Sequence, residues 1–242
     1  MTEKKAAIII GAGPGLGASL CRGFAKDGYA ICAVRRTKEK LEPLVAEIEA
    51  EGGEAHAYGA DAADEAAVED LFTRVEQEVG PVDLVVFNAN GFRKKSVIET
   101  TAQDYRSTWE NAAFAGFLAG RAAARRMIER ERGTILYTGA TASTRGGSGF
   151  AAFASAKFAL KATAQALARE LGPKGIHVAH VVVDGVIATP ATREWIDDAQ
   201  TKEDEDELLD TDAIAQAYRH LARQHRSAWT FELDLRPWTE EW

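Results

Sequence analysis

Residues 8–17 read Ile8-Ile9-Ile10-Gly11-Ala12-Gly13-Pro14-Gly15-Leu16-Gly17, and this stretch decides the fold. A β-branched apolar run leads directly into a glycine-rich turn. Leu16, Leu20 and Phe24 then recur at four-residue spacing, on one face of a helix. Glycines let the backbone turn sharply and approach a pyrophosphate, and a helix N-terminus offers free N–H groups to it. Strand, glycine turn and helix in this order therefore predict a phosphate-binding site, although such a turn also occurs as a plain strand-to-helix connection.

Strand and helix patterns alternate along the chain. Further apolar runs of strand length occur at Ala30–Val34, before Asp61, and at Leu84–Phe87, Thr134–Thr138, His177–Val183 and Trp229–Leu235. Amphipathic helical patterns separate them, as expected for parallel strands joined by helices. We therefore predict an α/β fold with a doubly wound parallel sheet of about seven strands and helices on both faces. Because no linker or repeat interrupts the pattern, we expect residues 1–242 to form a single domain.

Two long helical patterns are rich in alanine and glycine. The first begins at the capping-box-like Thr101–Asp104 and runs to about Glu131, and the second spans Phe150–Leu171. Small side chains allow another helix to approach closely, either within the chain or at a subunit interface. A further segment, Asp197–Asp212, is dense in acidic residues, and we interpret it as a solvated lid or loop rather than a binding tail.

The composition excludes several classes of protein. The formal net charge of −8 argues against nucleic acid and anionic membranes as partners. No apolar run approaches the ~20 residues of a membrane span. Cys21 and Cys32 fit two buried hydrophobic residues better than a disulfide, and we expect no metal site. Met1–Lys5 lead directly into the first strand and leave no room for a signal peptide, so we expect a cytoplasmic protein.

Several motifs, in order, resemble those of the short-chain dehydrogenase/reductase superfamily. They are Gly11-x-x-x-Gly15-Leu16-Gly17, Asp61, Phe87-Asn88-Ala89-Asn90, Phe153-x-x-x-Lys157, and Asp184-Gly185 followed by Thr189. The resemblance extends over nearly the whole chain. It implies a Rossmann fold that binds a nicotinamide dinucleotide and acts on a small molecule. It also implies a homodimer or homotetramer built through the two alanine-rich helices.

The resemblance also implies which residues contact the cofactor. They are Gly11, Gly13, Pro14, Gly15, Leu16, Gly17, Asp61, Ala62, Asn88, Ala89, Asn90, Lys157, Gly185, Val186 and Thr189. The residue type after the second strand discriminates between cofactors, because an acid there binds a ribose 2′-hydroxyl and an arginine suits a 2′-phosphate. Arg35 and Arg36 stand at this place with no acid before Glu39. They favour NADP(H) over NAD(H), the alternative being two surface cations.

The catalytic positions depart from the family pattern. Lys157 is present, but Phe153 stands where the family has its tyrosine, and Ala140 stands where it has its serine. Neither side chain donates a hydrogen bond. Thr141 is the first candidate for a replacement hydroxyl. Asn111 falls near the family's asparagine, with Ala112 as the alternative for the aligned position.

Asp184 replaces a family proline. It fits an acceptor for loop amides better than an acid–base group.

Two functions fit these residues. The first is an NADP(H)-dependent oxidoreductase with a degenerate catalytic triad, acting on a carbonyl, alcohol or enone. Lys157, Asn111 and Thr141 are its candidate catalytic residues, and its substrate would lie between Phe92, Phe153 and the segment 186–195. The second is a dinucleotide-binding sensor or partner subunit without turnover, because lost acid–base assistance removes a factor of ~10²–10⁴ in rate.

Overall fold

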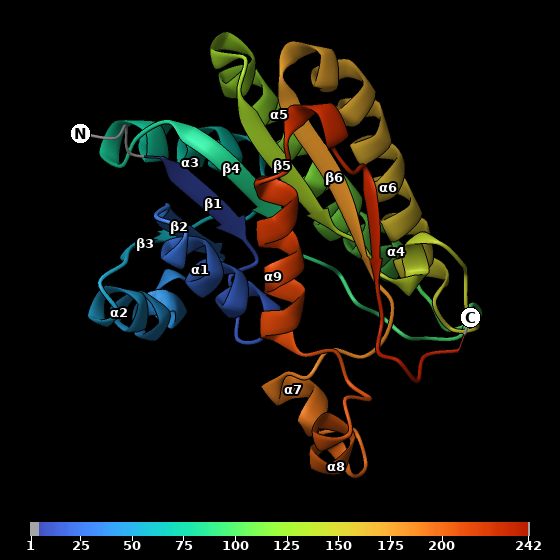
Figure 1. Cartoon of the computed structure of the whole chain (residues 1–242). Coiled ribbons are helices and arrows are strands. Elements are labelled where there is room, and N and C mark those ends of the chain that lie inside the picture. The colour runs from blue at the N-terminus through green and yellow to red at the C-terminus, as the bar shows by residue number, and fades with distance from the viewer. Residues whose placement is uncertain (1–4, 242) are drawn as a thin grey trace.

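Seven parallel strands form one sheet in the computed structural model, which describes residues 5–241 (Figure 1). The strands lie in the order β3-β2-β1-β4-β5-β6-β7. Their bounds are β1 (Ala6–Ile10), β2 (Ala30–Arg35), β3 (Glu54–Gly59), β4 (Val82–Phe87), β5 (Gly133–Thr138), β6 (Ile176–Val183) and β7 (Glu232–Leu235). The chain winds outward from β1 in one direction and then returns to start again at β4. The predicted doubly wound α/β sheet is confirmed.

Helices cover both faces of this sheet. One layer contains α3 (Glu65–Glu78), α5 (Ala115–Arg130) and α6 (Ala151–Leu171), and the other contains α1 (Leu16–Lys26), α2 (Glu42–Ala50) and α9 (Thr211–Ala222). Strand β1 shows why its sequence is apolar throughout. Ile8 and Ile10 pack against the first layer, whereas Ile9 packs against the second, so the strand has no face in contact with water.

The small residues of α5 serve packing within the chain. A Cβ at Gly116 would lie 2.3 Å from Leu160 Cδ1 on α6, and a Cβ at Gly120 would lie 1.9 Å from the Tyr137 hydroxyl on β5. A side chain at either position would therefore require Leu160 or Tyr137 to move from its observed place. Of the two readings of the small faces, close packing within the chain accounts for these two glycines.

The long helix expected from Thr101 to Glu131 is interrupted. It consists of α4 (Ala102–Trp109), a π-helical turn (Glu110–Phe114) and α5. Its expected start is confirmed, since Asp104 N donates to Thr101 Oγ1 at 3.0 Å and Asp104 Oδ2 accepts from Thr101 N at 3.2 Å. A period of 3.6 residues cannot reveal one wide turn inside a helix, and such turns occur often at functional sites.

The closing strand is shorter than the expected Trp229–Leu235. Strand β7 begins only at Glu232 because side chains occupy the backbone groups before it. The Thr230 N–H donates to Gln224 Oε1 at 2.8 Å, and the Thr230 carbonyl accepts from His177 Nε2 at 2.8 Å. These groups are then unavailable to a ladder with β6.

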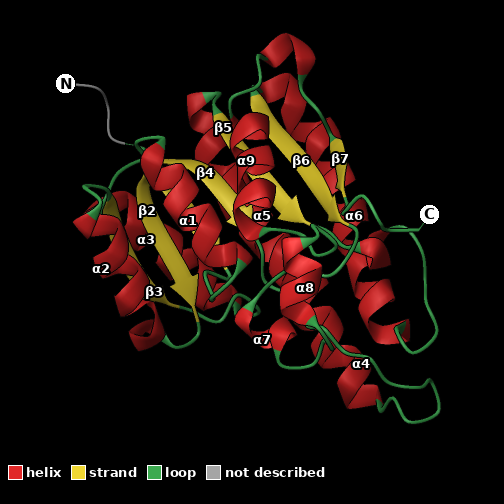
Figure 2. Ribbon diagram, turned by 60° about the horizontal axis from the view of Figure 1, so that its bottom comes forward, coloured by secondary structure: helices red, strands yellow, loops and turns green. Residues whose placement is uncertain are grey.

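The acidic segment is not simply a loop. It contains α8 (Ala199–Asp204), which follows α7 (Pro190–Arg193) beyond the end of the sheet toward which the strands point (Figures 1 and 2). Arg193 binds Glu203 through two hydrogen bonds of 2.6 and 2.7 Å, and Trp238 Nε1 donates to the Glu205 carbonyl at 3.1 Å. The segment expected to be a solvated lid or loop thus contains a short helix, and Arg193 partners Glu203, while most of its other acidic side chains are exposed.

Candidate active site

The glycine turn between β1 and α1 is tightly constrained on one side. Gly11 and Gly15 have φ angles of +91° and +99°, in the region that favours glycine. A Cβ at Gly11 would lie 2.8 Å from Ala89 N, and one at Gly17 would lie 2.2 Å from the Gly11 carbonyl. The turn therefore needs glycine in order to pass against β4 and its own helix.

The other side of the turn is open. A Cβ at Gly13 would meet no atom within 4 Å. The first N–H groups of α1, which begins at Leu16, have no acceptor within the helix. An open glycine backbone beside a helix N-terminus fits a pyrophosphate. The residues present thus fit a dinucleotide.

Residues after β4 hold the turn from beside it. Asn88 N donates to the Ile10 carbonyl at 2.8 Å, and its side-chain Nδ2 donates to the Gly11 carbonyl at 3.2 Å. Asn90 Oδ1 accepts from Phe92 N at 3.1 Å and so shapes the start of the next loop. The segment 88–90 therefore lies against the glycine turn, where the resemblance expects it.

The segment after β6 reaches the same turn. Thr189 Cγ2 would be 2.6 Å from a Cβ on Gly15, so the two residues are in close contact. Thr189 also caps α7, since its Oγ1 accepts from Thr192 N at 3.2 Å. Gly185 has a φ of +145°, and Val186 accepts from Leu209 N at 2.8 Å. The structure thus brings together the predicted residues after β6 and those of the glycine turn.

Arg35 and Arg36 lie at the end of β2, and Asp61 and Ala62 follow β3. Arg35 is half-buried and Arg36 is exposed, and neither makes an ion pair with any residue in the range 5–241. The Arg35 carbonyl accepts from Ala60 N at 3.2 Å, which brings Arg35 close to Asp61 along the chain. Asp61 Oδ1 accepts from Ala63 N at 3.0 Å, and Ala62 packs against the core. The two guanidinium groups are therefore available to a ligand.

Lys157 is buried, with a relative exposure of 2%. Its Nζ donates to the Thr138 carbonyl at 2.8 Å, and no carboxylate of the described residues pairs with it. Burial lowers the pKa of Lys157 to about 8, because the interior disfavours the charged form. The amine is therefore closer to neutrality than that of an exposed lysine.

Aromatic rings surround the position one turn before Lys157. The Phe153 ring centroid is 5.8 Å from Lys157 Nζ and 5.2 Å from the ring of Phe92. Phe92 also lies 6.0 Å from Phe150, and Ala140 packs against the same cluster. Neither Phe153 nor Ala140 places a hydrogen-bond donor here.

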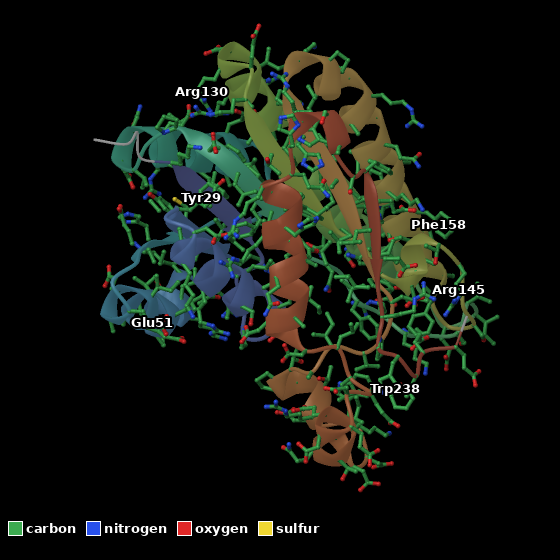
Figure 3. All side chains as sticks on the ribbon, in the orientation of Figure 1. Tyr29, Glu51, Arg130, Arg145, Phe158 and Trp238 are labelled. Carbon is green, nitrogen blue, oxygen red and sulfur yellow. The ribbon has the colours of Figure 1, made fainter. Side chains whose placement is uncertain are left out.

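Asp184 lies at the carboxyl end of β6 and is 2% exposed. Its Oδ1 accepts from the Thr141 hydroxyl at 2.5 Å, and its oxygens lie 3.7 Å from Arg145 and 3.6 Å from Arg236. Arg145 also pairs with Glu240 at 3.5 Å, at the corner marked by Arg145 in Figure 3. The expectation that Asp184 accepts from loop amides is wrong, because a hydroxyl and two guanidinium groups surround it.

Asn111 lies in the π-helical turn. It is half-buried, whereas Ala112 is fully buried, and the Asn111 side chain makes no hydrogen bond within the described part of the chain. Two residues around Asp184, Arg236 and Glu240, were missed by the sequence reasoning. They follow β7, and no motif connects them with the loop after β5.

The described residues contain neither a metal-binding cluster nor a membrane-spanning helix. Within residues 5–241, no set of three or more His, Cys, Asp or Glu side chains is placed to hold a metal ion. None of the helices in this range is both long and apolar enough to cross a membrane.

Comparison with known proteins matches the geometry. A family model described as short chain dehydrogenase matches residues 5–200. The 2,3-dihydro-2,3-dihydroxybenzoate dehydrogenase of Bacillus subtilis (strain 168) is 32% identical over 193 residues, which are 80% of this chain and 73% of that relative.

Solved structures of a short-chain dehydrogenase and of an alcohol dehydrogenase are also similar to this chain. A short-chain dehydrogenase from Rhodopseudomonas palustris is 43% identical with a TM-score of 0.84, over 97% of this chain and 99% of that one. An alcohol dehydrogenase from the archaeon Thermococcus sibiricus, complexed with 5-hydroxy-NADP, is 25% identical with a TM-score of 0.87, over 99% of each chain. The chain belongs to the short-chain dehydrogenase family.

Proposed function

We propose that this protein is an NADP(H)-dependent oxidoreductase whose active site lacks the usual phenol and hydroxyl. The observation that carries the proposal is the contact between Thr189 and Gly15, because it joins the segment after β6 to an open glycine turn. A crevice between these elements, at the carboxyl ends of the strands, is where open α/β sheets bind ligands. When bound there, the dinucleotide supplies or accepts a hydride.

The cofactor contacts follow from the position of each element. The turn 11–17 holds the pyrophosphate, and Asp61 with Ala62 faces the adenine. Residues 88–90 and 185–189 flank the rest of the cofactor, and Lys157 binds a ribose hydroxyl. Arg35 and Arg36 bind a 2′-phosphate, which is supported by their lack of ion-pair partners among the described side chains. We infer NADP(H) rather than NAD(H).

The substrate is a small carbonyl compound, alcohol or enone. It lies against Phe92 and Phe153, with the segment 186–195 on its other side. Lys157 is the only proton donor or acceptor that we place next to its oxygen, because Phe153 and Ala140 have none. Thr141 offers a lone pair rather than a hydrogen, since its hydroxyl already donates to Asp184. Asn111 acts from the π-helical turn, where its side chain has no partner among residues 5–241.

A second candidate has an observation of its own. The hydroxyl hydrogen of Thr141 is taken by Asp184, and Phe153 and Ala140 donate nothing, so the positions of the usual phenol and hydroxyl offer no donor to a carbonyl. This favours a dinucleotide-binding sensor or partner subunit without turnover. In either case residues 1–242 act as one domain in the cytoplasm, and α4, α5 and α6 form the contacts of a homodimer or homotetramer.

Two measurements separate these candidates. Calorimetric titration with NADPH and NADH tests cofactor binding, which both functions require. Absorbance at high protein concentration then follows NADPH consumption with ketones, aldehydes and enones, and NADP⁺ reduction with alcohols. Tight binding without turnover of any compound supports the sensor, whereas failure to bind either dinucleotide refutes both.

A further inference from the structure

A buried histidine beside the candidate site has a ring nitrogen with no partner in the described structure. His180, on β6, is fully buried, and its Nδ1 lies 3.2 Å from Glu232 Oε2 on β7. Its Nε2 makes no hydrogen bond to any residue in the range 5–241. Because a carboxylate only accepts, Nδ1 carries the ring hydrogen and Nε2 presents a lone pair. A buried acceptor of this kind is rare and calls for a function.

His180 Nε2 and the Lys157 amine contact neighbouring residues, Gly139 and Thr138 respectively. Lys157 Nζ donates to the Thr138 carbonyl at 2.8 Å. A Cβ at Gly139 would lie 2.5 Å from His180 Nε2, so the imidazole rests directly on the Gly139 α-carbon. Both groups are thus near one peptide group, under helix α6.

Charged groups continue from His180 to the surface. Lys161 is one turn after Lys157 on α6, and its Nζ lies 2.9 and 2.8 Å from the two carboxylate oxygens of Glu232. The side chains of Glu232 and Lys161 are 34% and 21% exposed, whereas Lys157 and His180 are buried. Polar groups therefore extend from the candidate site to the open edge of β7.

We propose that Lys157, His180 and Glu232 form a proton path between the active site and solvent. The proposal rests on the proposed function, with an alcohol as substrate. The alcohol O–H proton passes to the neutral amine of Lys157, while the hydride leaves to the bound nicotinamide. An N–H bond of Lys157 then breaks as the Nε2–H bond of His180 forms, directly or across a buried water. In the same step the Nδ1–H proton moves to Glu232.

Glu232 then releases this proton to water. His180 then returns from the Nε2–H to the Nδ1–H tautomer by exchanging its ring hydrogen through water, which restores the starting arrangement. The path needs no free imidazolium, which agrees with the environment of His180. Burial lowers the pKa of His180 to about 4, and the charges of Lys157 and Lys161 also lower it, while Glu232 raises it.

Ring-¹⁵N NMR on histidine-labelled protein tests the path without any substrate. We expect His180 to be the Nδ1–H tautomer and neutral at pH 7. Lys157→Met should raise its pKa because a neighbouring positive charge is lost, and Glu232→Gln should lower it. His177 is an internal control, since it lies on the same strand with its side chain on the other face, and its titration should not follow these variants. An Nε2–H tautomer, or a His180 titration unmoved by Lys157→Met, overturns the proposal.

Turnover gives the second test. With NADP⁺ and an alcohol that the wild type oxidises, His180→Phe should reduce the rate about tenfold or more and enlarge the solvent isotope effect. Its NADP⁺ affinity should stay unchanged. His177→Phe is the matched control, and His180→Gln replaces His180→Phe if the latter does not fold. An unchanged rate in His180→Phe refutes the path. If the wild type neither oxidises an alcohol nor reduces a carbonyl compound or enone, the proposed function fails, and the NMR result alone decides whether the groups are coupled.

Discussion

Thr189 and Gly15 are in contact at the carboxyl ends of the strands, with Thr189 Cγ2 only 2.6 Å from the place of a Cβ on Gly15. The contact joins the first βα turn to the segment after the sixth strand, and these are the two regions between which a dinucleotide would lie. A side chain at Gly15 would be excluded twice, by Thr189 and by the φ of +99°.

This relationship predicts different outcomes for two neighbouring glycines. Gly15→Ala should lower the free energy of unfolding by about 2 kcal/mol or more, because a left-handed backbone and a close contact act together. Gly13→Ala should leave stability nearly unchanged, since its Cβ meets no atom, yet weaken dinucleotide binding by filling the open side of the turn. Urea unfolding and calorimetry measure the two effects. A Gly13→Ala protein that binds as well as wild type would place the pyrophosphate elsewhere.

NADPH should bind at least ~10-fold more tightly than NADH, the value of one charge-assisted hydrogen bond. Arg35→Ala with Arg36→Ala should remove the difference by weakening NADPH alone. Lys174→Ala is the control. Lys174 lies in the turn between α6 and the start of β6, and its loss should change neither affinity. Equal affinities of the wild type for the two cofactors would contradict the role of the arginine pair.

Phe153→Tyr with Ala140→Ser should create carbonyl reductase activity or raise it by ~10² or more. The ring of Phe153 is already in place, and Lys157 lies one turn on, where its charge lowers the pKa of an added phenol. NADPH oxidation with a ketone and aldehyde panel measures the effect. Phe158→Tyr is the control: it adds the same hydroxyl at an exposed position of α6 and should leave the rate of NADPH oxidation unchanged (Figure 3). Brisk wild-type turnover that survives Lys157→Ala would show that another group does the chemistry.

Lys157→Met should stabilise the fold at pH 7. The pKa of Lys157 falls from 10.5 to about 8 on folding, so burying its charge costs up to about 3 kcal/mol. Between these two values the unfolded chain binds more protons than the folded one, and wild-type stability therefore rises with pH there. The gain from Lys157→Met should shrink from pH 7 to pH 10, as measured by urea unfolding. A gain that does not depend on pH would mean that packing, not charge, is responsible.

The protein should be a homodimer or homotetramer. Tyr105, Trp109 and Phe117 are exposed on α4 and α5, and the rings of Trp109, Phe114 and Phe117 stack on one another. Exposed aromatic side chains grouped in this way are typical of interfaces. Light scattering should give a monomer for Trp109→Glu with Phe117→Glu, and the wild-type mass for Trp238→Glu. A monomeric wild type would contradict the expected assembly.

The sequence predicts those parts of the fold whose causes are local. Ile8 to Gly17 contain a buried strand, a turn and a helix start within ten residues, and the strands and caps follow from similar short patterns. Lys157 and Phe153 could be identified only because Phe153-x-x-x-Lys157 resembles the family's motif. The partners of Asp184 could not, because Arg236 reaches it from beyond the last strand, and Glu240, also from beyond that strand, pairs with its other partner Arg145. His180 and Glu232 likewise meet only through the pairing of β6 with β7.

The contact of the glycine turn with Thr189 also affects how ligands can be found. Residues 11–17 follow the first strand of the sheet and lead into α1, and residues 185–189 follow the sixth strand, so a molecule bound between them ties together distant parts of the chain. Because it binds the folded chain only, it adds about 2.7 kcal/mol to the free energy of unfolding when its concentration is 100 times Kd. Occupancy therefore raises the melting temperature. Thermal melting thus reports occupancy of the crevice for any compound, including one that the protein never turns over.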